Sequence, residues 1–153
     1  MIIVLKGLKE YEFNENIWKN YSNLISNLIN DYKKINEKII CEEFEYTTIL
    51  LIDKILNHKF NNKEKFSKVP KPMREEFNFE DYVSQYDNNF YKFFDYEYNS
   101  EGDIELLKFI KCTNFFDIPE LFELSCAKMA ELCRNISSNK FQNLFLHNKN
   151  LNK

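Results

Sequence analysis

The chain has 153 residues, of which 44% are apolar, and its formal net charge is −3. This length suits one ordinary domain, and the apolar content is typical of a globular chain rather than a disordered one. The acidic balance argues against a dedicated nucleic-acid-binding protein, and the two glycines disfavour a glycine-rich phosphate loop.

The first thirty residues predict a hairpin followed by two short helices. Residues 2–6 and 10–13 are rich in β-prone side chains and are separated by three residues that include a glycine, which is typical of a hairpin. The asparagines that follow offer helix caps. An apolar stripe of helical spacing then runs through residues 17–28, and Asn20 and Ser22 offer a break within it.

A third strand and a longer helix are expected next. Residues 38–41 (KIIC) indicate a short strand, and residues 45–58 indicate an amphipathic helix. One face of that helix is expected to carry Ile49, Ile52, Ile55 and Leu56. Paired strands with helices stacked on them favour an α+β fold built around a small three-stranded sheet.

The middle of the chain differs in charge from what surrounds it. Residues 57–74 carry six Lys or Arg, whereas residues 75–105 carry ten Asp or Glu and many aromatic side chains. We expect a charged, flexible insertion at about 57–100 that returns to the domain surface near residues 86–94, because disordered segments are poor in aromatic residues. A basic run opposite an acidic one is better interpreted as a solvated loop than as a nucleic-acid patch.

The last third predicts helices on either side of a capped corner. Residues 104–110 form an apolar helical stripe. Asp117 is expected to be the N-cap of the next helix, with Pro119 in its first turn and Glu120 folding back to complete a capping box. That helix carries apolar side chains over a wider arc than one packing partner needs, and a last short helix is expected at 137–145.

Export, membrane insertion and metal binding find no support in the sequence. The apolar run at residues 2–5 is too short for a signal peptide, and no stretch approaches the roughly 18 apolar residues of a membrane span. The four cysteines form no C-x-x-C pair, and neither histidine stands at zinc spacing. We therefore expect reduced, buried thiols, no metal and no cofactor in a cytoplasmic and nuclear protein. These cysteines are Cys41, Cys112, Cys126 and Cys133.

The sequence contains no recognisable catalytic arrangement. His58 precedes a polar stretch and His147 lies near the end of the chain, so a nucleophile activated by a histidine is not expected. Phosphate-binding, dinucleotide-binding and zinc-protease motifs are absent from the sequence. The surplus apolar helical surface instead points to a non-catalytic protein that binds another protein.

Residues 106–145 resemble the C-terminal region of the Skp family, the adaptor subunits of cullin–F-box (SCF) ubiquitin ligases. The family pattern is an apolar helix, then A-x-N-[YF]-L-D-[IC], then L-L-D-x-[TS]-C-x-x-[VM]-A, then a short helix ending in Phe. The chain supplies T-N-F-F-D-I at residues 113–118 and L-F-E-L-S-C from residue 121, followed by Met129 and Ala130. Residues 2–59 follow the order of elements in the family's BTB/POZ fold.

The resemblance implies a BTB/POZ-like domain at residues 1–116 and a helical F-box-binding extension at residues 117–147. It implies a non-catalytic adaptor that bridges a cullin N-terminal domain to F-box substrate receptors in ubiquitin-dependent protein degradation. Family members usually continue with an acidic segment and a closing helix, so the chain is expected to be a divergent, C-terminally short member.

The resemblance also assigns residues to two binding faces. Asn114 and Phe115, at the corner, are expected to contact the cullin, whereas the adjacent Phe116 is expected in the core. The F-box is expected to contact Phe122, Met129, Cys133, Phe141 and Phe145.

Two other functions stay open at this point. An elongin C-like adaptor shares the BTB core but normally ends near the corner, and the residues after it count against that interpretation. A structural BTB subunit, for example of a kinetochore, would self-assemble. For the adaptor we expect at most a weak homodimer, and neither a nucleic-acid nor a membrane partner.

Overall fold

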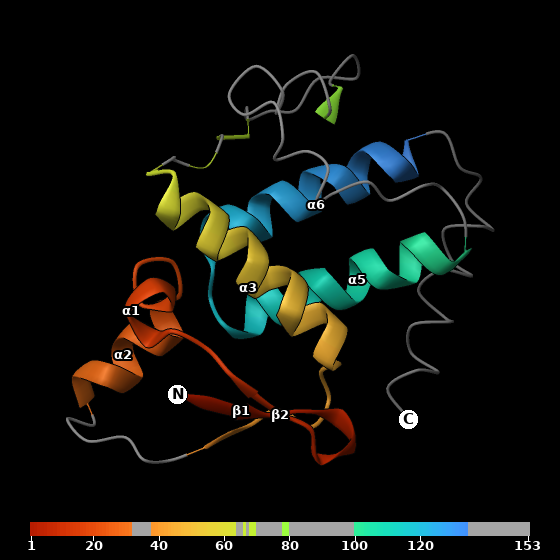
Figure 1. The fold of residues 1–153 in the computed structure, drawn as a ribbon. Coiled ribbons are helices and arrows are strands. Elements are labelled where there is room, and N and C mark those ends of the chain that lie inside the picture. Colours follow the sequence, from red (N-terminus) through yellow and green to blue (C-terminus); the bar gives the residue numbers. More distant parts are fainter. Residues whose placement is uncertain (32–37, 64–65, 67, 70–77, 80–99, 135–153) are drawn as a thin grey trace.

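The computed structural model is an α+β fold with a three-stranded mixed sheet, and five α-helices lie within the residues it describes (Figure 1). The structure describes residues 1–31, 38–63, 66, 68–69, 78–79 and 100–134.

The sheet forms from all three predicted strand regions. Strands β1 (Ile2–Val4) and β2 (Glu10–Glu12) pair antiparallel around a 3-10 turn at Lys6–Leu8, which confirms the hairpin. Strand β3 (Ile39–Ile40) pairs parallel with β1, so the strand order is β2-β1-β3. The side chain of Ile3, at the centre of the sheet, is fully buried and faces the helices.

Two short helices follow the hairpin, as the sequence predicts. In front of α1 (Glu15–Trp18), the side chain of Asn14 accepts a hydrogen bond from a backbone N–H of the first turn. Ser22 breaks the apolar stripe and starts α2 (Asn23–Asp31), because its Oγ accepts the backbone N–H of Ile25 at 3.1 Å. The predicted break is therefore a helix cap.

Helix α3 (Tyr46–Asn61) buries the face that its spacing predicts, and all four residues assigned to that face are fully buried. The helix continues past residue 57, so the expectation of a loop was wrong for residues 57–61. Lys59 explains the difference, because it occupies the next position of the buried stripe. Its side chain is fully buried and its Nζ lies 5.4 Å from the ring centre of Phe66.

A carboxylate on α3 organises the contact between α3, α1 and β2. The Asp53 side chain accepts a hydrogen bond from the Tyr11 hydroxyl at 2.5 Å and another from the Trp18 indole N–H at 2.7 Å. Asn57 donates to the same carboxylate at 2.9 Å. Because Trp18 is fully buried, Asp53 satisfies a polar group that water does not reach.

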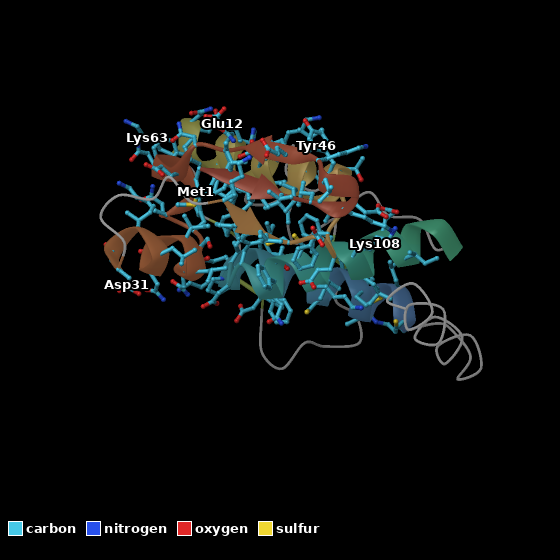
Figure 2. The ribbon with its side chains drawn as sticks, turned by 90° about the horizontal axis from the view of Figure 1, so that it is seen from below. Met1, Glu12, Asp31, Tyr46, Lys63 and Lys108 are labelled. Carbon is cyan, nitrogen blue, oxygen red and sulfur yellow. The ribbon has the colours of Figure 1, made fainter. Side chains whose placement is uncertain are left out.

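Helices α5 (Ser100–Phe115) and α6 (Pro119–Cys133) lie side by side and are joined by a tight corner, while α3 crosses over α5 (Figure 1). Side chains fill the space between these helices and the sheet (Figure 2). The main core spans the sheet and α1, α2, α3, α5 and α6. A smaller core joins α5 to α6 through Leu106, Leu107 and Met129.

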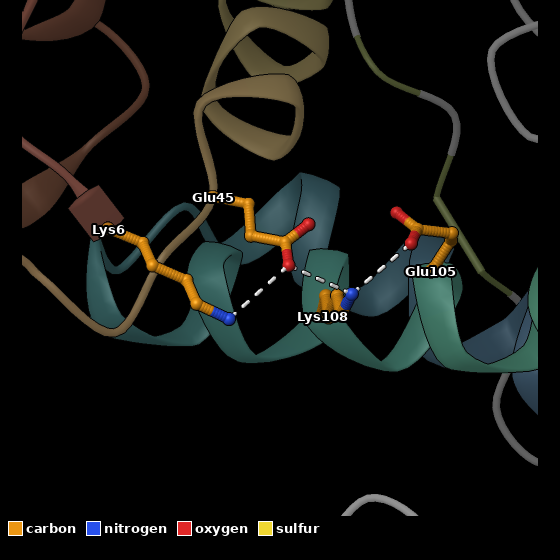
Figure 3. A network of polar contacts seen from close by, with 4 residues as sticks. All are labelled: Lys6, Glu45, Glu105 and Lys108. Atoms are coloured by element: carbon orange, nitrogen blue, oxygen red, sulfur yellow. Dashed lines mark hydrogen bonds and ion pairs between the residues drawn. The ribbon is translucent and has the colours of Figure 1, made fainter. Parts of the chain in front are cut away.

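A chain of charged side chains ties the hairpin and α3 to α5 (Figure 3). Glu45, just before α3, lies 3.1 Å from Nζ of Lys108 and 3.8 Å from Nζ of Lys6. Lys108 also pairs with Glu105 at 3.3 Å. Burial opposes the charge of Lys108, but its hydrogen bond to Glu45 and its interactions with Glu105 outweigh that effect and raise its pKa.

Candidate partner-binding surface at the corner between α5 and α6

The corner is built by the way α5 ends. Asp117 has a positive φ of 50° and donates its backbone N–H to the carbonyl of Asn114, while Ile118 donates to the carbonyl of Thr113. These two bonds form a Schellman motif with Asp117 in the left-handed position, a conformation that Asp tolerates better than most residues. The backbone direction therefore reverses sharply directly after Phe116.

The predicted capping box was wrong. The N-cap of α6 is Ile118, and no side chain caps it, although Pro119 does lie in the first turn as expected. The capping box does not form because the corner between α5 and α6 is too short for Asp117 to serve both helices. The residue that could have capped α6 already adopts the left-handed conformation that ends α5, so Asp117 serves the earlier helix.

Helix α2 holds the corner from the other side. The hydroxyl of Ser22 donates to the carbonyl oxygen of Phe116 at 2.5 Å, and the backbone N–H of Asn23 donates to the carbonyl oxygen of Asp117 at 2.9 Å. Carbonyls at the end of a helix otherwise lack partners. The start of α2 therefore fixes the backbone on which the predicted site residues stand.

The two adjacent phenylalanines of the corner point to different environments, as expected. Phe116 is fully buried, and its ring lies 5.3 Å from that of Trp18. Phe115 is 41% exposed, and its ring lies 5.1 Å from that of Phe116 and 5.2 Å from that of Phe44. The exposed ring is therefore supported from beneath by other rings, which limits its motion.

Asn114 precedes Phe115 and is also exposed. No hydrogen bond to its side chain is found in the part of the chain that the structure describes, so the amide can donate to or accept from a partner. Together with Phe44 and Phe115 it forms what we call the corner surface. Sequence reasoning missed Phe44, because its contact with Phe115 joins two segments that are distant in the sequence.

Two thiols lie beneath this region. Cys41 and Cys112 are buried in the main core. Burial raises the pKa of Cys41 to about 11, with a smaller effect from Glu43, and burial raises the pKa of Cys112 well above its ordinary value. Both groups therefore stay protonated near neutral pH and are poor nucleophiles.

None of the four cysteines forms a disulfide, but Cys126 and Cys133 are only partly buried. The expectation of buried thiols was therefore right for two cysteines and wrong for the two on α6. They differ because α6 has one face that the described residues do not fully cover.

The predicted F-box residues on α6 fall into two groups. Phe122 and Cys133 are partly exposed and, with Cys126, lie on one stripe of the helix. Met129 is only 9% exposed and packs with Leu107 in the smaller core, so its side chain belongs mainly to the contact between α5 and α6. Phe141, Phe145 and the expected helix at 137–145 lie outside the described residues.

One residue of the predicted insertion contacts α6. Phe79 is buried in the main core, its backbone N–H donates to a carboxylate oxygen of Glu131 at 2.5 Å, and Nζ of Lys128 lies 5.6 Å from its ring centre. The insertion therefore contributes a core residue. Residues 86–94, where we expected the insertion to return, lie outside the described residues.

No protein-family model matches the chain, and no curated protein matches it. In the described part of the chain, no helix is long and apolar enough to cross a membrane.

Proposed function

We propose that the chain is a non-catalytic adaptor that joins a cullin N-terminal domain to F-box substrate receptors in an SCF-type ubiquitin ligase. The observation that carries the proposal is the exposure of Phe115 next to the buried Phe116. The resemblance of residues 106–145 to the Skp family assigns the exposed aromatic residue and Asn114 to the cullin contact.

The exposed part of the Phe115 ring is costly. Phe115 is 41% exposed, so it forgoes a substantial part of the hydrophobic stabilisation that full burial would give. Phe115 rests on Phe44 and Phe116, so it is held in place before a partner binds. A rigid, exposed aromatic residue beside a free amide is typical of an interface hot spot, because little conformational entropy is lost on binding.

The arrangement of elements supports the same proposal. The mixed sheet with order β2-β1-β3 and the helices that cover it suit a BTB/POZ-like core at residues 1–116. Beyond the corner, α6 offers the partly exposed stripe of Phe122, Cys126 and Cys133 to the F-box. We include Met129, Phe141 and Phe145 in the proposed F-box contact on the resemblance alone. Such an adaptor would act in the cytoplasm and the nucleus.

The elongin C-like alternative is disfavoured by α6. This helix continues for 15 residues beyond the corner and packs against α5 through its own small core. A chain that bound its partners only through the region before the corner would not need α6. A structural, self-assembling BTB subunit remains the other alternative, and the experiment below distinguishes it.

The experiment measures binding of the full chain to a recombinant cullin N-terminal domain and, separately, to an F-box peptide. Replacing both Asn114 and Phe115 by Ala should weaken cullin binding by about 30-fold or more, since hot-spot residues contribute about 2 kcal/mol or more. The same variant should keep its F-box affinity. Phe122→Ala should show the opposite pattern.

The matched control is Phe60→Ala on α3, because Phe60 is 42% exposed and thus comparable with Phe115. It should leave both affinities unchanged. Binding of the wild-type chain to neither partner would refute the adaptor function. Preference for a BC-box peptide would favour the elongin C-like alternative. A tight homodimer by light scattering that an F-box peptide does not dissociate would favour the structural subunit.

A further inference from the structure

Four carboxylates flank the residues of the corner surface in the sequence, and we call them the acidic rim: Glu42, Glu43, Asp117 and Glu120. All four are exposed. The first two immediately precede Phe44, and the other two follow Phe116. The ring of Phe44 lies 5.2 Å from that of Phe115, which brings the segment that carries Glu42 and Glu43 to the end of α5.

The acidic rim is not neutralised within the described part of the chain. None of its four carboxylates forms an ion pair there, whereas Glu45, next to Phe44, is already paired with Lys108 and Lys6 (Figure 3). Two lysines belong to the same region: Lys111, one turn before Phe115 on α5, and Lys6, whose backbone N–H donates to the carbonyl oxygen of Phe44 at 2.9 Å. The face therefore carries a net negative potential around an exposed ring.

Carboxylates gathered in this way repel one another, which opposes folding rather than supporting it. Their field extends about one Debye length, roughly 8–10 Å at moderate salt, which covers the edge of a docking patch. Charges at the rim of an interface change the rate of encounter and the choice of partner more than they change the strength of the docked contact.

We propose that the partner that docks on the corner surface presents Lys and Arg side chains around the apolar recess that receives Phe115. The acidic rim steers this basic surface into register before Phe115 and Asn114 make their contacts. This inference rests on the proposed function, and it names the chemistry by which one cullin N-terminal domain is recognised over others. A cullin with an acidic or neutral surface at this position associates slowly.

The test measures association and dissociation rate constants of the full chain with a cullin N-terminal domain as salt is raised from about 50 to about 500 mM NaCl, which shortens the Debye length several-fold. For the wild-type chain the association rate constant should fall by about 10-fold or more, as electrostatically steered encounters do. The dissociation rate constant should change by less than about 2-fold.

Substitutions in the acidic rim test whether its carboxylates cause the salt dependence of the association rate constant. Glu42→Gln with Glu43→Gln should lower the association rate constant about 3- to 10-fold at low salt, and Glu42→Lys with Glu43→Lys should lower it further. The matched control is Glu12→Gln with Glu15→Gln, at the end of β2 and the start of α1, which removes the same charge from two exposed carboxylates without an ion pair among the described residues. Glu12 lies on the side of the molecule away from α5 and α6 (Figure 2). The control should match the wild type.

The outcomes separate this inference from the adaptor function. If the cullin domain binds but its association rate is independent of salt, or if rim and control variants behave alike, the basic partner is refuted and the adaptor function stands. If the wild-type chain binds no cullin domain at any salt concentration, both are refuted. Melting temperatures of the variants equal to that of the wild type ensure that a changed rate is not a folding defect.

Discussion

The hydroxyl of Ser22 donates a hydrogen bond to the carbonyl oxygen of Phe116 at 2.5 Å, across 94 residues of sequence. The same oxygen of Ser22 accepts the backbone N–H of Ile25, so one side chain caps α2 and holds the end of α5. The exposed ring of Phe115 stands one residue away. Its position is therefore set partly by the second helix of the N-terminal half.

Ser22→Ala should destabilise the fold by about 1–3 kcal/mol, because it removes a helix cap and leaves a buried carbonyl without its donor. Urea unfolding followed by circular dichroism measures this loss. Ser26→Ala, one turn along α2, is the control and should change stability by less than about 0.5 kcal/mol. Equal effects of the two substitutions would show that the hydrogen bond from Ser22 to Phe116 does not stabilise the fold.

Asp53→Ala should cost about 2–3 kcal/mol, because the buried indole N–H of Trp18 and the hydroxyl of Tyr11 both lose their acceptor. Asp53→Asn should cost less, since the amide oxygen can still accept from Trp18. Denaturant unfolding of both variants measures the difference. The neighbouring Lys54 is exposed, and its Ala variant should unfold like the wild type.

Asp117→Val should destabilise the chain by about 1–2 kcal/mol, because a β-branched residue fits the left-handed conformation at φ 50° poorly. Asp117→Asn should be nearly neutral, since Asn tolerates the same conformation. Thermal unfolding of the two variants provides the measurement. A Val variant as stable as the wild type would contradict the Schellman geometry of the corner.

Phe115→Ala and Phe116→Ala should differ sharply in stability. Removing the buried ring of Phe116 should cost about 3–5 kcal/mol, because it leaves a cavity beside Trp18. Phe115→Ala should cost about 1 kcal/mol or less, as its ring is 41% exposed. Chemical unfolding measures both. A similar loss for the two variants would mean that Phe115 is a core residue and not available to a partner.

Stability should decline at alkaline pH because of the two core thiols. The folded state raises the pKa of Cys41 from 9.0 to about 11, so above pH 9 the unfolded chain loses a proton that the folded chain keeps. The stability from this thiol is complete below pH 9 and is lost as pH rises towards 11. Cys112, whose pKa burial also raises, acts in the same direction.

Urea midpoints between pH 7 and pH 10 test this expectation. The midpoint should stay level to about pH 8.5 and then fall, and Cys41→Ala should make the fall shallower. The range stops at pH 10 because Tyr11, whose pKa is raised by burial and by its hydrogen bond to Asp53, begins to contribute above its ordinary value of 10.0. A midpoint that rises above pH 9 would contradict the burial of these thiols.

The sequence by itself determined most of the local structure. Runs of β-prone residues identified the hairpin and the third strand, and helical spacing identified the buried face of α3, because these patterns depend on neighbouring residues alone. The same local logic found the break at Ser22. The expectation that Phe116 is buried and Phe115 exposed came from the resemblance and not from spacing, and the structure confirms it.

The tertiary structure decided what local spacing leaves open. Asp117 ends α5 instead of starting α6, since two helices compete for one residue and the tighter reversal determines its conformation. Phe44, in the segment between β3 and α3, meets Phe115 only in the folded chain. Lys59 contacts Phe66 beyond the end of α3, and Met129 is turned into the contact between α5 and α6. The contacts of Phe44 and Met129 join segments distant in the chain, and no periodicity encodes such contacts.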